Sequence, residues 1–93
     1  MISPVNDRGE RRFPSITGNR WWHPVPPDEV SPGDVFVWSC HRLNRRCIGI
    51  AARVHHGRKH RRVRPRQAWS GGALLPWVEI RAVIEVWRKG RKS

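Results

Sequence analysis

The sequence is poor in acidic residues. Only seven Asp and Glu stand against nineteen Lys and Arg, giving a net charge of +12 over 93 residues, and none lies between Val35 and Val78. So basic a chain associates with polyanions through phosphate contacts and counterion release. The composition favours nucleic acid as the partner. It also fits a structural protein of a virion or ribonucleoprotein assembly, in which the chain packs on protein partners and neutralises nucleic acid.

Long apolar runs are missing as well. No run approaches the ~20 residues that cross a bilayer, and residues 1–12 lack the apolar core of a secretory signal. We therefore expect no membrane partner and a cytoplasmic location, in a cell or in an infected cell. In that reducing compartment the two cysteines are expected to be free thiols.

The patterns typical of catalysis are also missing. The sequence has no carboxylate pair in an apolar setting, no glycine-rich phosphate loop and no nucleophile elbow. Cys40 and His41 are adjacent, but neighbouring side chains diverge on a strand, so they do not form a nucleophile–base pair. We predict that the protein is not an enzyme and uses no cofactor.

Four residues form a weak zinc pattern: Cys40, Cys47, His56 and His60. The two cysteines are farther apart than the usual spacing of about two to four residues. The histidines lie in a strongly basic segment, whose charge opposes a dication. We therefore expect no metal and interpret the four residues as sheet thiols and surface histidines.

The clearest structural signal is an antiparallel hairpin. Residues 31–34, Ser-Pro-Gly-Asp, are of types that are common in turns. Val35–Cys40 is rich in β-branched and aromatic residues that suit a strand, and a polar link separates it from a second apolar run, Cys47–Val54. Every second residue of that second run is apolar, and in a strand such residues point to the same face. Four side chains are therefore expected on one face: Ile48, Ile50, Ala52 and Val54.

A second alternating pattern runs from Trp77 to Trp87 and predicts one long strand. A few twisted strands do not bury both faces of an open sheet, so closure or assembly with other chains is needed. We predict a mostly β fold, a small β-barrel over residues 20–88. Residues 1–19 are expected to form a flexible arm anchored by Phe13 and Ile16, and residues 89–93 a basic tail.

The most basic stretch runs from Arg53 to Arg66. Val63 is the only apolar residue there after Val54, so we expect no burial and either a solvated loop or a protruding hairpin. Arginine offers a planar fork that fits phosphate oxygens. The candidate nucleic-acid-binding residues are Arg53, Arg58, Lys59, Arg61, Arg62, Arg64 and Arg66. A solvated loop without a specific partner is the alternative.

The tryptophans fall into two groups. Trp38, Trp77 and Trp87 lie in or beside expected strands, so packing in the core or on the sheet is favoured. Trp21, Trp22 and Trp69 lie beside turn residues, where an indole can stack on a base, with ordinary packing as the equal alternative. Because Trp21 and Trp22 point to opposite faces of a strand, only one of them is expected to be buried.

Three segments together resemble a known family: Pro32–Trp38, Ile48–Val54 and Trp77–Arg81. Their order is similar to that of EVE domains, of the PUA-like superfamily, over about half of the chain. The resemblance implies a small β-barrel that holds an extruded, often modified, base in an aromatic pocket. The Pro-Gly-Asp entry is also similar to SH3-like barrels, including translation and phage head–tail proteins. The candidate stacking residues are Trp21, Trp22, Trp38 and Trp69. DNA or RNA, and a plain or modified base, remain open.

Overall fold

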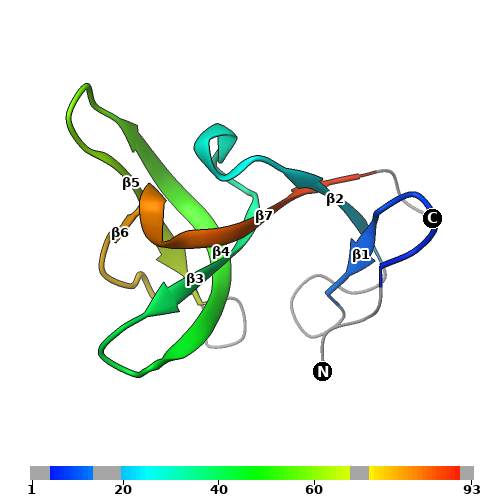
Figure 1. Ribbon diagram of the computed structural model, residues 1–93, viewed down its shortest axis with the longest axis horizontal. Coiled ribbons are helices and arrows are strands. Elements are labelled where there is room, and N and C mark those ends of the chain that lie inside the picture. Colours follow the sequence, from blue (N-terminus) through cyan, green and yellow to red (C-terminus); the bar gives the residue numbers. More distant parts are fainter. Residues whose placement is uncertain (1–4, 14–19, 68–71, 91–93) are drawn as a thin grey trace.

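The computed structural model describes residues 5–13, 20–67 and 72–90. They form one antiparallel sheet in the order β1-β2-β7-β3-β4-β5-β6 (Figure 1). This part of the chain contains no α-helix, and the sheet is open, with β1 and β6 at its edges. The predicted mostly β class is confirmed. The elements are β1 (Arg11–Arg12), β2 (Trp21–Val25), η1 (Pro27–Glu29), β3 (Val35–Cys40), β4 (Arg45–His56), β5 (Arg61–Arg66), β6 (Val78–Glu79), η2 (Ile80–Ala82) and β7 (Val83–Lys89), where η marks a 3-10 turn.

The predicted hairpin is confirmed as β3 and β4. Its turn ends at Asn44, which has a φ of 49°, a left-handed conformation that asparagine tolerates better than most residues. The single apolar face predicted for the second strand is wrong, because the register shifts between Ala51 and Arg53. One extra residue in a strand moves every later side chain to the other face. Ile48 and Ile50 therefore lie on one face, whereas Val54 lies with Ala51 on the other.

Both faces of the central strands are buried. On one face Phe36 and Trp38 pack with Val86 in the larger core cluster, and Cys40 and Cys47 lie at its margin. On the other face Val35 packs with Trp87, Trp22 and Phe13. Alternation along β3 assigns Val35 to one cluster and Phe36 to the other, as period two requires. A sheet buried on both faces needs a cover on each side.

The N-terminal segment supplies one of these covers. Phe13 is buried, and its ring lies edge-on to Trp22 at 6.3 Å and to Trp87 at 5.9 Å between centroids. Arg11 and Arg12 form β1, which pairs with β2. Within the predicted arm, Arg11 and Arg12 thus belong to the sheet, and Phe13 is an anchor as expected. Ile16, the other expected anchor, lies outside the described residues.

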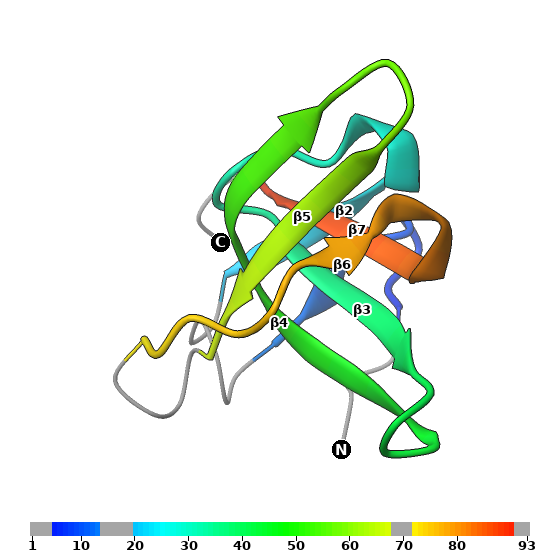
Figure 2. The same cartoon turned by 90° about the vertical axis from the view of Figure 1, so that its left-hand side faces the viewer.

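The long strand predicted over residues 77–87 is wrong, because η2 divides it into β6 and β7 (Figure 2). β6 pairs with β5, whereas β7 pairs with β2 and β3. A straight strand cannot reach both places, so the chain turns between them. The face predicted from the alternation is also broken: Val83 and Val86 are buried, whereas Ile84 is exposed. Trp77, expected to pack, is 40% exposed.

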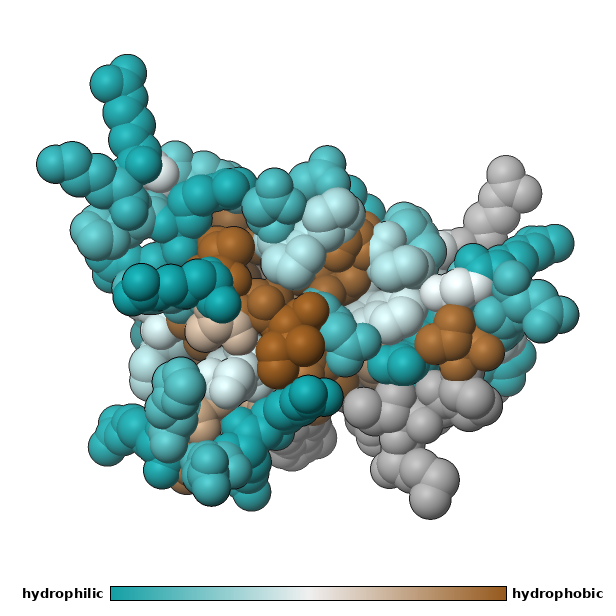
Figure 3. Space-filling model, viewed as in Figure 1, coloured by the Kyte–Doolittle hydropathy of each residue, from teal (hydrophilic) through white to brown (hydrophobic). Residues whose placement is uncertain are grey.

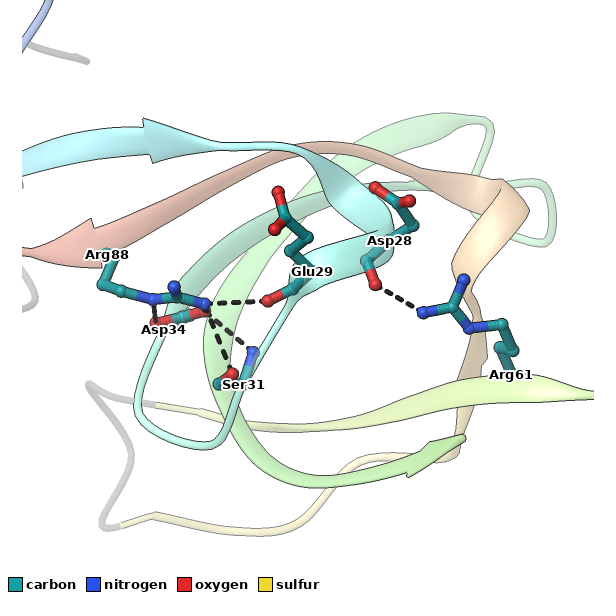
Figure 4. Close-up of polar contacts among 6 residues, drawn as sticks. All are labelled: Asp28, Glu29, Ser31, Asp34, Arg61 and Arg88. Atoms are coloured by element: carbon teal, nitrogen blue, oxygen red, sulfur yellow. Dashed lines mark hydrogen bonds and ion pairs between the residues drawn. The ribbon is translucent and has the colours of Figure 1, made fainter. Parts of the chain in front are cut away.

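An ion pair joins the Ser-Pro-Gly-Asp turn to the end of β7 (Figure 4). The buried Asp34 carboxylate accepts hydrogen bonds from Arg88 Nε at 3.2 Å and Nη2 at 3.1 Å, and from the Ser31 N–H at 2.8 Å. Arg88 Nη2 also donates to the carbonyl of Glu29, at 2.8 Å. The pKa of the Arg88 guanidinium is raised above its ordinary value, first by the hydrogen bond to Asp34, although burial opposes the rise.

Replacing Gly49 by valine is expected to destabilise the fold. A Cβ at Gly49 would lie 3.2 Å from the Arg66 carbonyl oxygen and 3.3 Å from the Trp38 ring. Overpacking of this kind costs about 1–3 kcal/mol of unfolding free energy, which urea unfolding measures. Ser39→Val, on the half-exposed part of β3, is the control. Equal stability of Gly49→Val and wild type would mean that the close approach does not constrain the strand.

Asp34→Ala is expected to lower the free energy of unfolding by about 1–3 kcal/mol, because Arg88 and the Ser31 N–H lose their acceptor. Glu79→Ala is the matched control: it breaks the Glu79–Arg81 pair, whose side chains are both exposed, and should cost under about 1 kcal/mol. The same urea titrations measure both. A loss at Asp34 no larger than that at Glu79 would contradict this role of the turn.

Candidate nucleic-acid interface

Residues 53–66, which we call the basic arm, form a β-hairpin that projects from the body of the sheet (Figure 1). It consists of the end of β4, a short connection over residues 57–60, and β5. The Gly57 N–H donates to the His60 carbonyl at 3.1 Å, which closes the connection with Arg58 and Lys59 at the apex. Hydrophilic side chains cover this projection (Figure 3, upper left).

One face of the arm is anchored in the core. Val63 and Pro65 are fully buried, and Val54 packs against the same cluster. The expectation that the segment stays unburied is therefore wrong for its base, and the segment is a hairpin and not a loop. A strand needs only alternate apolar residues to bury one face, so a single valine and a proline are sufficient here. The protruding hairpin, the other form expected, agrees with the structure.

The opposite face of the arm carries cations. Arg53 lies opposite Arg64, and His55 lies opposite Arg62, in the register of β4 and β5. Like charges directly opposite each other on a sheet, such as Arg53 and Arg64, destabilise it. We call this the outer face of the arm. It consists of Arg53, His55, Arg62, Arg64 and Arg66.

Two of the candidate arginines also hold the arm in place. Arg61 Nη2 donates to the backbone carbonyl of Asp28 in η1 (Figure 4) and lies 3.2 Å from His56 Nδ1. Arg64 Nε donates to the carbonyl of Leu75 at 3.0 Å. These bonds fix the direction of the arm relative to the rest of the sheet.

The other five candidates have no hydrogen-bond or ion-pair partner for their side chains within residues 5–13, 20–67 and 72–90. Glu79 lies opposite Arg62 in the register of β5 and β6, but its carboxylate pairs with Arg81 at 2.6 Å. The charge of the arm is therefore largely uncompensated by the described part of the chain. The five are Arg53, Arg58, Lys59, Arg62 and Arg66.

None of the candidate stacking tryptophans that the structure describes belongs to this face. Trp22 and Trp38 are buried, and Trp21 is half-buried under the Arg12 guanidinium, 4.1 Å from the ring centroid. The expectation that only one of Trp21 and Trp22 is buried is confirmed. Trp69 lies outside the described residues. The structure thus offers no exposed ring face at Trp22 or Trp38 for a base.

The weak zinc pattern is not brought together. Cys40 and Cys47 are free, half-buried thiols beside the core, whereas His56 and His60 lie near the tip of the arm. Among the residues that the structure describes, no three His, Cys, Asp or Glu side chains are grouped so that they could hold a metal ion.

Sequence reasoning missed an open pocket of about 640 Å³ beside the Ser31–Asp34 turn. Its walls come from four separate parts of the chain and include Trp22 and two cations besides Arg88, namely Arg20 and Lys89, with Ile50 as a further apolar wall. The Pro-Gly-Asp turn is the one local signal, and it does not reveal which distant residues it faces. Arg88 itself is engaged by Asp34.

Comparison of the chain with protein-family models, with curated proteins and with solved structures gave no significant match. The likeness to EVE domains therefore depends on the three motifs alone. Within the described residues, no helix is long and apolar enough to span a membrane.

Arg64→Ala is expected to lower the free energy of unfolding by about 1 kcal/mol, because it removes the hydrogen bond to Leu75. Arg53→Ala is the matched control, since Arg53 is the cross-strand neighbour of Arg64 and its replacement removes the same like-charge pair. It should leave stability unchanged or raise it by a few tenths of a kcal/mol. Urea unfolding of both variants tests this, and equal losses would contradict a positioning role for Arg64.

Proposed function

We propose that this protein is a small nucleic-acid-binding module and that the basic arm is its binding surface. The observation that carries the proposal is the outer face of the arm, where Arg53 stands opposite Arg64 and no side chain forms an ion pair within the described residues. Such a face is electrostatically unfavourable in the isolated chain. A polyanion relieves the repulsion, and release of its counterions adds to the affinity.

The spacing of the outer face supports a phosphate backbone as the partner. Arg62, Arg64 and Arg66 alternate along β5, so they repeat every ~6.6 Å. The guanidinium of Arg64 is oriented by Leu75 through Nε, which leaves its two Nη groups to donate to phosphate oxygens. A row of cations at this spacing matches successive phosphates of one strand better than it matches a compact anion.

A small barrel of the PUA-like or SH3-like type is part of the proposal. The sheet curves so that η2 contacts η1, β3 and β5, which brings its β6 end back over the central strands. The aromatic base pocket implied by the likeness to EVE domains has less support, because Trp22 and Trp38 are buried. The proposal therefore depends on the arm and not on stacking.

Replacing Arg53, Arg62 and Arg66 together by alanine is expected to weaken binding to all sequences alike. For each phosphate that the variant no longer binds, the slope of log affinity against log salt should fall by up to ~0.9 on duplex DNA, or ~0.7 on single strands. These three side chains have no structural partner in the described chain, so the variant should keep its fold. Fluorescence anisotropy with a labelled oligonucleotide measures both affinity and slope.

The control removes the same charge elsewhere, with Arg42, Arg45 and Arg46 replaced by alanine in and beside the β3–β4 turn, where all three are exposed. An unchanged slope in the arm variant would place the interface elsewhere. Equal losses in the two variants would mean that binding follows total charge, and would favour the structural protein of a virion or ribonucleoprotein assembly.

A further inference from the structure

The tip of the basic arm is not explained by binding to phosphates alone. Arg58 and Lys59 stand at the apex, and His55, His60 and Arg62 flank them, all exposed. Gly57 keeps the tip narrow: a Cβ there would lie 2.8 Å from His55 Nε2 and 2.8 Å from the His60 carbonyl oxygen. The apex therefore presents long donor side chains at the end of a thin two-stranded ribbon.

The size of this ribbon fits one groove in particular. Strands of a sheet lie ~4.8 Å apart, and the major groove of B-form DNA, ~12 Å wide, admits a two-stranded β-ribbon, whereas the minor groove is only ~6 Å wide. At ~3.3 Å per residue, Arg58 stands up to about 13 Å beyond Val54, the last residue of β4 that packs on the core. The major groove is ~8.5 Å deep, so the tip reaches its floor.

The composition of the arm disfavours single strands. Proteins that bind unpaired nucleic acid stack successive bases chiefly on Trp, Tyr and Phe, and the sequence has none of these three between Trp38 and Trp69. Duplex RNA fits poorly too, because its major groove is deep and too narrow for side chains to read. Arginine and lysine donors instead suit O6 and N7 of guanine in the major groove of DNA.

The arm is also oriented by contacts with the rest of the chain. On its inner side Arg61 donates to the Asp28 carbonyl (Figure 4), and Val63 is buried. Because Arg61 is donor-only, His56 Nδ1 accepts the hydrogen bond between them. A ribbon that is already oriented loses little conformational freedom on binding. The acidic Asp28 lies in η1, beside the inner side of the arm, so negative charge on this side favours approach of a duplex to the outer face.

We propose that the basic arm inserts its tip into the major groove of double-stranded DNA, with Arg58 and Lys59 at the base edges and the outer face on a flanking backbone. This inference rests on the proposed nucleic-acid-binding function and adds the kind of nucleic acid and the groove. The arm thereby combines positioning by phosphates with contacts that sense the bases.

The first test compares one sequence as duplex DNA, as duplex RNA and as single strands, by fluorescence anisotropy at ~0.15 M salt. Wild-type protein should bind duplex DNA at least about tenfold more tightly than the other two. Binding to all three without that preference would overturn the groove assignment and leave the nucleic-acid-binding function standing. No salt-sensitive binding to any of them would overturn the function itself.

The second test identifies the groove. Duplex DNA with bulky substituents on pyrimidine C5, which fill the major groove, should bind about tenfold more weakly than plain duplex. A small ligand that occupies the A·T minor groove should leave binding unchanged. The proposal would be overturned if the minor-groove ligand abolished binding and the C5 substituents left binding unchanged.

The third test uses the tip itself. The variant Arg58→Ala/Lys59→Ala should bind plain duplex DNA about tenfold more weakly, and the C5 substituents should then have little further effect. Arg42→Ala/Arg46→Ala removes two positive charges at the β3–β4 turn and should keep the sensitivity to C5 substituents. Circular dichroism checks that both variants are folded. Full sensitivity to C5 substituents in the tip variant would show that the apex does not enter the groove.

Discussion

The arrangement of this sheet depends on the hydrogen bonds and the ion pair that the buried Asp34 carboxylate makes. It accepts the Ser31 N–H within its own turn and the guanidinium of Arg88 from β7, so it joins the entry of the central hairpin to the strand beside it. The backbone of the same turn bonds to β4 through Ala51 N–H to Asp34 O at 2.7 Å and Gly33 N–H to Ala51 O at 2.8 Å. Three strands meet at one residue. A carboxylate so enclosed is tolerated because each of its bonds is made, two of them to a cation.

The register of the central strands follows from two irregularities. A shift between Val37 and Trp38 changes the pairing of β3 with β7, and another between Ala51 and Arg53 changes that of β4 with β5. The first leaves the extra residue Ile84 in β7, so that Val83 and Val86 both reach the larger core cluster. The second moves the side chains of β4 that follow it to the opposite face. The second shift brings Val54 into the larger core cluster. The arm that begins there can therefore bury Val63 and Pro65 while its arginines face outward.

In the arm, exposed positive charge and stability oppose each other. Like charges face each other across β4 and β5, which weakens the hairpin in isolation. Burial of Val63 and the bonds made by Arg61 and Arg64 oppose that repulsion. Arginine therefore has two roles in one hairpin: Arg61 and Arg64 orient it, and the other arginines leave their charge exposed. Composition alone does not separate these roles, because the separation depends on which carbonyl groups lie within reach.

The local elements could be predicted from the amino-acid sequence alone. Turn chemistry at Pro32 and Gly33 and the β-branched run after it are short-range signals, and they predicted the β3–β4 hairpin with the correct bounds of β3. The cationic stretch was also evident, since charge is read directly from composition. The remaining features arise from tertiary contacts. The break at η2 occurs because β6 and β7 pair with different strands, and Trp22 and Trp38 are buried because distant segments cover them. The Asp34–Arg88 pair joins residues far apart in the chain. The periodicity of apolar residues and their strand propensity describe neighbours along one strand. These features depend instead on contacts between segments that only the folded chain brings together.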